Sequence, residues 1–398
     1  MLPATFSDGR RLSKPAMKLL MLAQTPPPLH GQSRMAQVLV TGLPALGIPL
    51  HPVPLNLSRD SSDIGRWRPG KVLTVLRACV AAWRARRAAG CDTLYYIPAP
   101  ARRGALYRDW VVMLLCRPFF PRLVLHWHAS GLGAWLGTRA TPPERWLTSW
   151  LLGRADVAIV LTDSLRADAA VLHPRRVAVV PNGIPDPCPA WTPRPANPPP
   201  HTVLFLGLCA AEKGLFDAAA AVLAANRAAG THRFSLVAAG PFADAATAAR
   251  FAALAAAQPQ VVRHAGFVTG PAKDDLLRAS FCLCLPTRYP HEAQPLVLLE
   301  ALAHDLPVIA TDWRGISATL PPGPLCAPGD VPALAAALLA LDRQPPAPGD
   351  RRAHFLRHFT VERHLARLAA ALSGTAAGLD AEGERGTQRD DGSAARPA

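Results

Sequence analysis

The sequence lacks any apolar run long enough to cross a bilayer, which takes about 18 to 20 consecutive apolar residues. The stretch "VVMLLC" at 111–116 is one of the longest runs, and it is far shorter. The first 16 residues are basic, but no apolar segment follows them before Met17, so we do not expect a signal peptide. Both observations predict a cytoplasmic protein without a membrane-spanning segment.

Paired cysteine motifs are also absent. The chain has eight cysteines, and none of them forms a C-x-x-C pair. The two closest, Cys282 and Cys284, lie inside an apolar run. This placement favours buried strand thiols over metal ligands, and it indicates a reducing compartment.

Lysine is rare, and the positive charge comes almost entirely from arginine. The chain has 43 lysines and arginines, of which five are lysines, and its formal net charge is +15. Such a charge indicates anionic partners such as nucleic acid, a membrane surface or phosphorylated ligands. A bias toward GC-rich codons, which encode Arg, Ala, Pro and Gly, explains the same composition equally well.

Basic residues mix with aromatic residues in the first half of the chain. The stretch "WRARRAAG" at 83–90 precedes several arginines between 102 and 122, with Tyr107, Trp110, Phe119 and Phe120 among them. This mixture suits peripheral contact with an anionic membrane. Solvated helix faces of the same composition are equally common.

Short apolar runs alternate with helical stretches rich in Ala and Leu, which predicts parallel sheets flanked by helices. Strands are expected at 18–24, 93–99, 122–129, 157–162 and 177–182, and again at 202–208, 233–240, 261–266, 280–287 and 307–312. The expected organisation is a disordered extension at 1–16, an N-terminal Rossmann-like domain at 17–184, a Pro-rich linker at 185–201, a C-terminal Rossmann-like domain at 202–345, a helical segment at 346–373 and a disordered tail at 374–398.

Two carboxylates bracket the start of an apolar helix in "PTRYPHEAQPLVLLEALAHDLPVIATD", residues 286–312. Pro295 fits the first helical turn, which puts Gln294 at or near the N-cap and Glu292 at an anion-binding helix end. Glu292 could simply cap that end. Glu300 lies inside the apolar run, where a buried carboxylate needs a partner. The combination suits a ligand with polyol and diphosphate parts, such as a nucleotide sugar.

The segment "HEAQPLVLLEALAHDLPVIATDWRGI" resembles the E-x7-E region of the retaining glycosyltransferases of family 4. Further segments agree in order, namely "PPPLHGQSRM" at 26–35, "VVPNGI" at 179–184, "LFLGLCAAEKG" at 204–214, "AAGP" at 238–241 and "HAGFV" at 264–268. The resemblance spans about residues 17–372. It implies the GT-B fold, in which two Rossmann-like domains with parallel sheets face each other across a cleft, the second holding the nucleotide sugar and the first the acceptor.

The resemblance also implies roles for the residues of the motif. Glu292 would contact the hydroxyls of the donor sugar, and Glu300 would hold the ribose. The backbone N–H groups of Ala293, Gln294 and Leu296 would bind sugar or diphosphate oxygens.

Lys213, in "AEKG", would neutralise the leaving diphosphate, unless it is an ordinary solvated loop lysine. The family usually has Gly-Arg where this chain has Gly207 and Leu208, so one cation is missing. Arg288 is a candidate to replace it. Gly31 follows the first strand, and without a side chain it would let backbone approach a ligand closely, or it is an ordinary turn glycine.

A histidine pair lies near the end of the strand in "LHWHAS". The family keeps a histidine at such a strand end close to the donor sugar, and His128 fits best, with His126 as second choice. Either one alone would more readily be a core histidine with a backbone partner. No third metal ligand is evident, and transfer in the family needs no metal, so we expect neither a metal nor a cofactor besides the donor.

These expectations describe a hexosyltransferase that moves a sugar from a nucleoside-diphosphate sugar to a hydroxyl acceptor with retention. The expected acceptor is a glycan or a polyprenyl-diphosphate-linked sugar at the inner face of the cytoplasmic membrane, for exopolysaccharide, capsule or O-antigen. Two alternatives remain: another GT-B enzyme such as an epimerase or a phosphorylase, and a non-catalytic basic protein that binds nucleic acid. The second alternative leaves the two glutamates unexplained.

Overall fold

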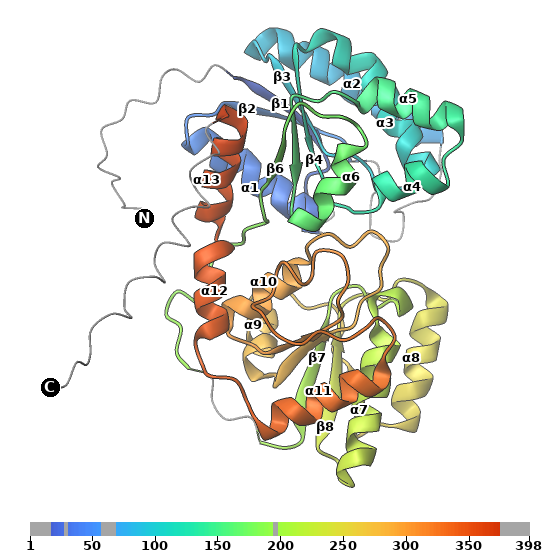
Figure 1. Cartoon of the computed structure of the whole chain (residues 1–398), viewed down its shortest axis with the longest axis vertical. Coiled ribbons are helices and arrows are strands. Elements are labelled where there is room, and N and C mark those ends of the chain that lie inside the picture. Colours follow the sequence, from blue (N-terminus) through green and yellow to red (C-terminus); the bar gives the residue numbers. More distant parts are fainter. Residues whose placement is uncertain (1–16, 28–30, 57–68, 194–197, 375–398) are drawn as a thin grey trace, which may run out of the picture.

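The computed structural model describes residues 17–27, 31–56, 69–193 and 198–374. Two parallel α/β domains follow one another along the chain, and the last helices return from the second domain to the first (Figure 1). The disorder expected at 1–16 and in nearly all of 374–398 lies outside the described residues.

The first domain contains a six-stranded parallel sheet in the order β2-β1-β3-β4-β5-β6. Its strands are β1 (Leu19–Ala23), β2 (Leu50–Pro54), β3 (Thr93–Tyr96), β4 (Arg122–His126), β5 (Val157–Val160) and β6 (Val177–Val179). Its helices are α1 (Gly31–Ala45), α2 (Pro69–Ala89), α3 (Arg103–Cys116), η2 (Arg117–Phe119), α4 (Leu132–Thr138), α5 (Pro142–Leu152), η3 (Asp163–Leu165) and α6 (Arg166–Ala170).

The second domain contains a five-stranded parallel sheet in the order β11-β10-β7-β8-β9. Its strands are β7 (His201–Leu206), β8 (Phe234–Ala239), β9 (Val262–His264), β10 (Cys282–Leu285) and β11 (Val308–Ala310). The helices that follow β7 are η4 (Ala211–Lys213), α7 (Leu215–Ala229), α8 (Ala245–Ala257), α9 (Gly270–Ala279), α10 (Leu296–Ala303), α11 (Val331–Arg343), α12 (Asp350–His358) and α13 (Val361–Ser373).

Continuous apolar runs form these sheets because helices cover both faces of a parallel sheet. All five residues of β1 are buried, as are all four of β10, which include Cys282 and Cys284. The ten strands expected from such runs are present, with ends shifted by a few residues. Each of the eight cysteines is buried and free, which confirms the interpretation of strand thiols in β10.

The sequence reading missed one strand, β2. Its sequence, "LHPVP", carries two prolines and only one buried residue, Val53. Proline removes a ladder N–H, and it is therefore tolerated at a sheet edge. β2 is the edge strand next to β1, which explains both its weak apolar signal and its two prolines.

The C-terminal helices tie the two domains together. Phe355 of α12 lies in the apolar core of the second domain. Leu365, Leu368 and Leu372 of α13 pack into the core under β1 of the first domain. The segment expected at 346–373 thus spans both domains, which is also visible in the red helices of Figure 1.

The start of the Pro-rich linker is held by a buried arginine. Arg352 is 6% exposed, and its two terminal nitrogens bind the Asp186 carboxylate at 2.8 and 2.6 Å. One of them also donates to the carbonyl of Cys188 at 2.7 Å. Residues 194–197 of the linker lie outside the described residues. No helix among the described residues is long and apolar enough to cross a membrane.

Candidate active site

A cleft of about 800 Å³ lies between the two domains. Residues of both domains line it, and many of them follow the carboxyl ends of strands, where ligands of parallel α/β sheets bind. The first domain contributes Gly31 and His128, and the second contributes Gly207, Lys213 and Glu292. The structure therefore brings these five expected site residues together in one cleft.

Glu292 and Lys213 form an ion pair in the cleft. Glu292 is 6% exposed, and its Oε2 accepts hydrogen bonds from Lys213 Nζ at 2.7 Å and from Thr287 Oγ1 at 3.1 Å. The ammonium also lies 4.5 Å from the centre of the Tyr289 ring. A charge held among a carboxylate, a hydroxyl and an aromatic face is fixed in position, so the cleft has one preorganised cation beside one carboxylate.

The helix after Glu292 begins one residue later than expected. Pro295 is the N-cap of α10, with extended backbone, and Leu296 is the first helical residue. The loop before it is fixed by close packing, since a Cβ on Gly315 would lie 2.0 Å from the Ala293 carbonyl oxygen. Ala293, Gln294 and Leu296, whose backbone N–H groups the resemblance assigns to the donor, line the cleft.

Two amide side chains of the cleft keep unpaired polar atoms. Asn182 donates from its backbone N–H to Gln294 Oε1 at 2.7 Å, and this bond joins the two domains. Asn182 Oδ1 and Gln294 Nε2 are both buried without a hydrogen-bond partner among the described residues. A buried unpaired donor and a buried unpaired acceptor are each costly, and a hydroxyl can satisfy either kind of atom.

Glu300 does not line the cleft. It is 5% exposed, and its Oε1 accepts bonds from Arg34 Nη1 at 2.5 Å and from Lys273 Nζ at 2.6 Å. Arg34 belongs to α1 of the first domain, so this bond also crosses between domains. The partner that a buried carboxylate requires is therefore supplied by two cations, and a ribose would have to share Glu300 with them.

Residues 200–343 match the sequence profile of the family described as Glycosyl transferases group 1. The second domain is a group 1 glycosyltransferase domain. No curated protein sequence matches the chain.

Solved structures that cover 90% of the chain show the GT-B fold expected from the sequence. Sucrose-phosphate synthase from Thermosynechococcus elongatus aligns with a TM-score of 0.67 and 18% identity over 90% of this chain and 98% of its own. Anabaena HepE, in complex with UDP and glucose, aligns with a TM-score of 0.63 and 17% identity over 90% of this chain and 100% of its own. The family match thus places a glycosyltransferase domain in the second half of the chain, and the fold agrees with it.

A third solved structure of similar fold is a UDP-forming trehalose-phosphate synthase. An α,α-trehalose-phosphate synthase from Burkholderia xenovorans, in complex with glucose-6-phosphate, aligns with a TM-score of 0.61 and 13% identity, covering 90% of this chain and 98% of its own. At such identities these likenesses describe the fold alone.

The structure separates the two histidines of the glycosyltransferase. His128 lines the cleft, whereas His126 is fully buried and its Nδ1 lies 2.5 Å from the Tyr95 hydroxyl. Burial, with smaller contributions from His128 and His364, lowers the pKa of His126 well below its usual value. His126 is therefore held neutral in the core, and the geometry favours His128 as the histidine that can meet a ligand.

The position of the missing arginine presents an apolar side chain. Leu208 is 40% exposed and lines the cleft next to Gly207, whose φ is +127°. Arg288, the candidate replacement, does not line the cleft, because its guanidinium pairs with Asp217 of α7. The structure therefore does not bring Arg288 to the place where the cation is missing.

Sequence reasoning missed the cations of the first domain as site residues. Lys71, Arg102 and Arg108 line the cleft together with Lys213, and Glu292 is the one carboxylate among the described lining residues. In the sequence, Arg102 and Arg108 are part of a basic, aromatic stretch. No motif marks them, and their common location follows from the way α2 and α3 meet at the cleft.

Proposed function

We propose that the protein transfers a hexose from a nucleoside-diphosphate sugar to an acceptor hydroxyl, with retention at the anomeric carbon. The observation that carries this proposal is the Lys213–Glu292 pair in the interdomain cleft. An ammonium suits a diphosphate, and a carboxylate suits sugar hydroxyls. The unpaired atoms of Asn182 and Gln294 offer further partners for those hydroxyls.

The leaving diphosphate needs positive charge, and Lys213 supplies it. When the donor binds, the ammonium bridges the diphosphate and Glu292 Oε2, while Oε1 of Glu292 accepts from a sugar hydroxyl. Glu300 serves the ribose, and the N–H groups of the loop before α10 serve the sugar and the diphosphate. We further propose that the side-chain cations of the cleft, with Lys213 at the diphosphate, make a divalent metal unnecessary for transfer.

Retention follows if the acceptor attacks from the face that the diphosphate leaves. Glu292 is the one carboxylate among the described residues of the cleft, and it is already engaged with Lys213 and Thr287. We therefore assign it to hydroxyl binding rather than to a covalent intermediate. The departing diphosphate accepts the acceptor's proton.

A panel of nucleoside-diphosphate sugars tests this function. We expect at least one of them to be hydrolysed slowly without acceptor, with release of the free hexose and the nucleoside diphosphate. Release of an isomerised sugar would instead identify an epimerase. If the protein neither turns over nor binds any member of the panel, the proposed function is wrong.

We propose a lipid-linked acceptor at the inner face of the cytoplasmic membrane, used in building a surface polysaccharide. The helices α2, α3 and α5 are neighbours in the first domain (Figure 1). Support for the proposal comes from the exposed apolar side chains that they carry. They include Leu73, Leu76, Leu114, Trp146 and Trp150, which are 41–66% exposed. Aromatic and aliphatic side chains beside many arginines suit an anionic bilayer surface.

Vesicle flotation tests the membrane contact. We expect the protein to bind vesicles with anionic lipids at low salt, and to bind neutral vesicles at least about tenfold more weakly because each nearby cation adds to the attraction. Replacing Trp146 and Trp150 with Ser should reduce binding, since both rings are exposed and stack on each other at 6.0 Å. Equal binding to both vesicle types would contradict the proposed contact.

A further inference from the structure

One end of the cleft opens between α2 and α3 of the first domain. Its lining residues from these helices include Lys71, Val72 and Val75 on α2, and Gly104, Arg108 and Val111 on α3. We call this part of the cleft the α2–α3 mouth. It combines cations with apolar side chains and has no carboxylate among its described lining residues.

The amino-terminal end of α3 faces this mouth without a cap. The N-cap residue Arg102 has extended backbone, and no side chain of the described residues caps the first turn. Gly104 lines the mouth, and a Cβ added there would meet no atom of residues 17–27, 31–56, 69–193 or 198–374 within 4 Å. Free N–H groups and the helix dipole favour an anion at such an end, and the missing side chain leaves room for one to approach the backbone.

Arg108 is a second, independent feature of the same mouth. Its Nε and Nη2 donate to Asp109 Oδ1 at 2.9 and 2.7 Å. Asp109 is 1% exposed and also accepts from the Tyr96 hydroxyl at 2.6 Å and from the Ala99 N–H at 2.7 Å. The guanidinium is thus held from behind while its side chain stays 24% exposed to the mouth, so little side-chain entropy remains to be lost when an anion binds.

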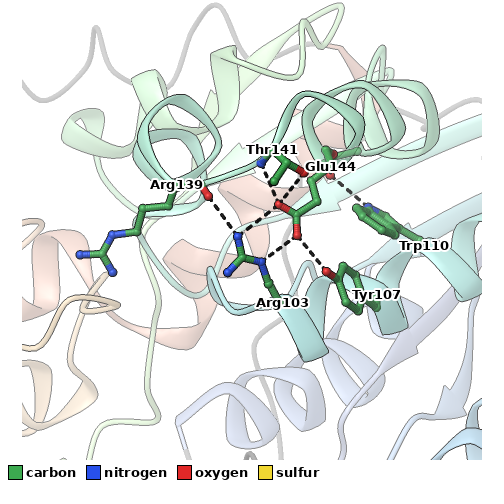
Figure 2. A network of polar contacts seen from close by, with 7 residues as sticks. Arg103, Tyr107, Trp110, Arg139, Thr141 and Glu144 are labelled. Atoms are coloured by element: carbon green, nitrogen blue, oxygen red, sulfur yellow. Dashed lines mark hydrogen bonds and ion pairs between the residues drawn. The ribbon is translucent and has the colours of Figure 1, made fainter.

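A second network fixes the first turns of α3 against α5 (Figure 2). Arg103 Nε and the Tyr107 hydroxyl both donate to Glu144 Oε1 at 2.8 Å. The other carboxylate oxygen accepts from the Thr141 N–H at 2.8 Å, which completes a capping box on α5. Arg103 therefore points to α5, and it leaves Arg102 and Arg108 as the α3 cations that line the cleft.

The walls of the mouth are apolar and continue onto the surface. Val72 is 51% exposed and Val111 is 36% exposed, whereas Val75 is buried. Leu76 and Leu114 extend the apolar strip outside the cleft, at 41% and 54% exposure. A free sugar needs carboxylates and amides for its hydroxyls, whereas cations beside an apolar strip suit an anion with an apolar tail.

We propose that the α2–α3 mouth binds the diphosphate of a lipid-linked acceptor, with the lipid chain lying along the strip of Val72, Leu76, Val111 and Leu114. The uncapped end of α3, Arg108, Arg102 and Lys71 hold the diphosphate. This assignment rests on the proposed glycosyl transfer and adds the residues that select the acceptor. It predicts two separate anion sites in one cleft, one at Lys213 for the donor and one at Arg108 for the acceptor.

Calorimetric titration of the full chain tests the two sites without catalysis. The probes are farnesyl diphosphate, inorganic diphosphate, farnesol and a nucleoside diphosphate. We expect farnesyl diphosphate to bind wild-type protein at least tenfold more tightly than inorganic diphosphate or farnesol, because head and tail are both used. Arg108→Gln should weaken it at least tenfold, and Arg77→Gln, which removes an exposed cation of α2 outside the cleft, less than twofold.

Crossed variants separate this inference from the proposed function. Lys213→Ala should weaken the binding of the nucleoside diphosphate at least tenfold and that of farnesyl diphosphate less than twofold. Arg108→Gln should have the opposite effect on the two ligands. Val72→Gln should weaken farnesyl diphosphate and spare inorganic diphosphate, and because Val72 is half exposed the variant should fold.

Two results would overturn the assignment. One is farnesyl diphosphate that binds no better than inorganic diphosphate, and the other is binding that depends on Lys213 rather than on Arg108. Either result leaves glycosyl transfer standing if the nucleoside diphosphate still depends on Lys213. Failure of the nucleoside diphosphate to bind, with farnesyl diphosphate bound through Arg108, would count against the donor site alone. Thermal unfolding of each variant within a few degrees of wild type shows that the fold is intact.

Discussion

The two walls of the cleft differ in how they hold charge. On the second domain, Lys213 is paired with Glu292, and a helix end, a hydroxyl and an aromatic ring surround the pair. On the first domain, Arg108 is tied to Asp109 behind the wall, and apolar side chains surround the opening. Among the described lining residues, the first wall offers both a cation and a carboxylate, which suits the proposed sugar-nucleotide donor, whereas the second offers cations alone.

This difference explains why one wall carries motifs and the other does not. A nucleotide sugar presents a ribose, a diphosphate and a hexose in a fixed order, so the loop and helix that would hold it need particular residues at particular spacings. A wall that receives a charged head and a flexible apolar tail needs only cations and apolar area in the right place. The exposed Arg102 and the half-buried Arg108 can therefore belong to a basic stretch without a motif and still line the site.

The largest expected effect comes from breaking the charge pair of the second wall. Glu292→Gln and Lys213→Ala should each reduce transfer at least about tenfold, or about 1.4 kcal/mol of barrier, because each removes a charge that faces the reacting groups. Initial rates at saturating donor, measured beside Arg77→Gln as control, check this. Rates equal to wild type in both variants would remove Lys213 and Glu292 from the site.

A smaller effect should come from restoring the cation that this wall lacks. Leu208 is exposed in the cleft, so Leu208→Arg should fit without repacking and strengthen nucleoside diphosphate binding about fivefold, or about 1 kcal/mol. Leu208→Gln, of similar length but without charge, is the matched control. An equal gain in the Gln variant would show that charge is not what the position lacks.

The smallest effect should come from removing Glu144, whose hydrogen bonds hold α3 against α5 in the first wall. Bonds from Arg103, from the Thr141 N–H and from Tyr107 lower the pKa of Glu144 to about 2. Its contribution to folding is therefore complete above its ordinary pKa of about 4.5, and it is lost as the pH falls from there toward 2. The acid limb of a thermal unfolding profile should be shallower for Glu144→Gln than for wild type. Parallel limbs would indicate that the network does not stabilise α3 and α5.

The sequence predicted the sheets and the second wall far better than the first wall. Buried parallel strands give continuous apolar runs, and the spacing of Glu292 and Glu300 is local in sequence. The sequence did not predict the edge strand β2. Its two prolines are tolerated only at a sheet edge, and the sequence alone does not show which strand lies at an edge. The positions of Lys71, Arg108 and Leu208 around one cavity depend on how two helices and two domains meet, and local patterns do not encode that.

The buried Glu300 shows the same limit of prediction from sequence. The sequence indicated correctly that this carboxylate needs a partner, but it could not show that Arg34 and Lys273 already fill that need. Arg34 lies 266 positions away in the chain, so the contact exists only once the domains meet. Whether a ribose joins or displaces Arg34 is a property of the bound state that a donor titration of Arg34→Gln would reveal as a change in affinity.

The most direct test of the central claim is the binding of nucleoside diphosphates to wild type, Lys213→Ala and the control Arg263→Gln, an exposed cation of β9 outside the cleft. The donor site predicts that at least one nucleoside diphosphate raises the unfolding temperature of wild type and of Arg263→Gln. The shift should be largely lost in Lys213→Ala. An equal shift in all three proteins, or no shift in any of them, would contradict the account.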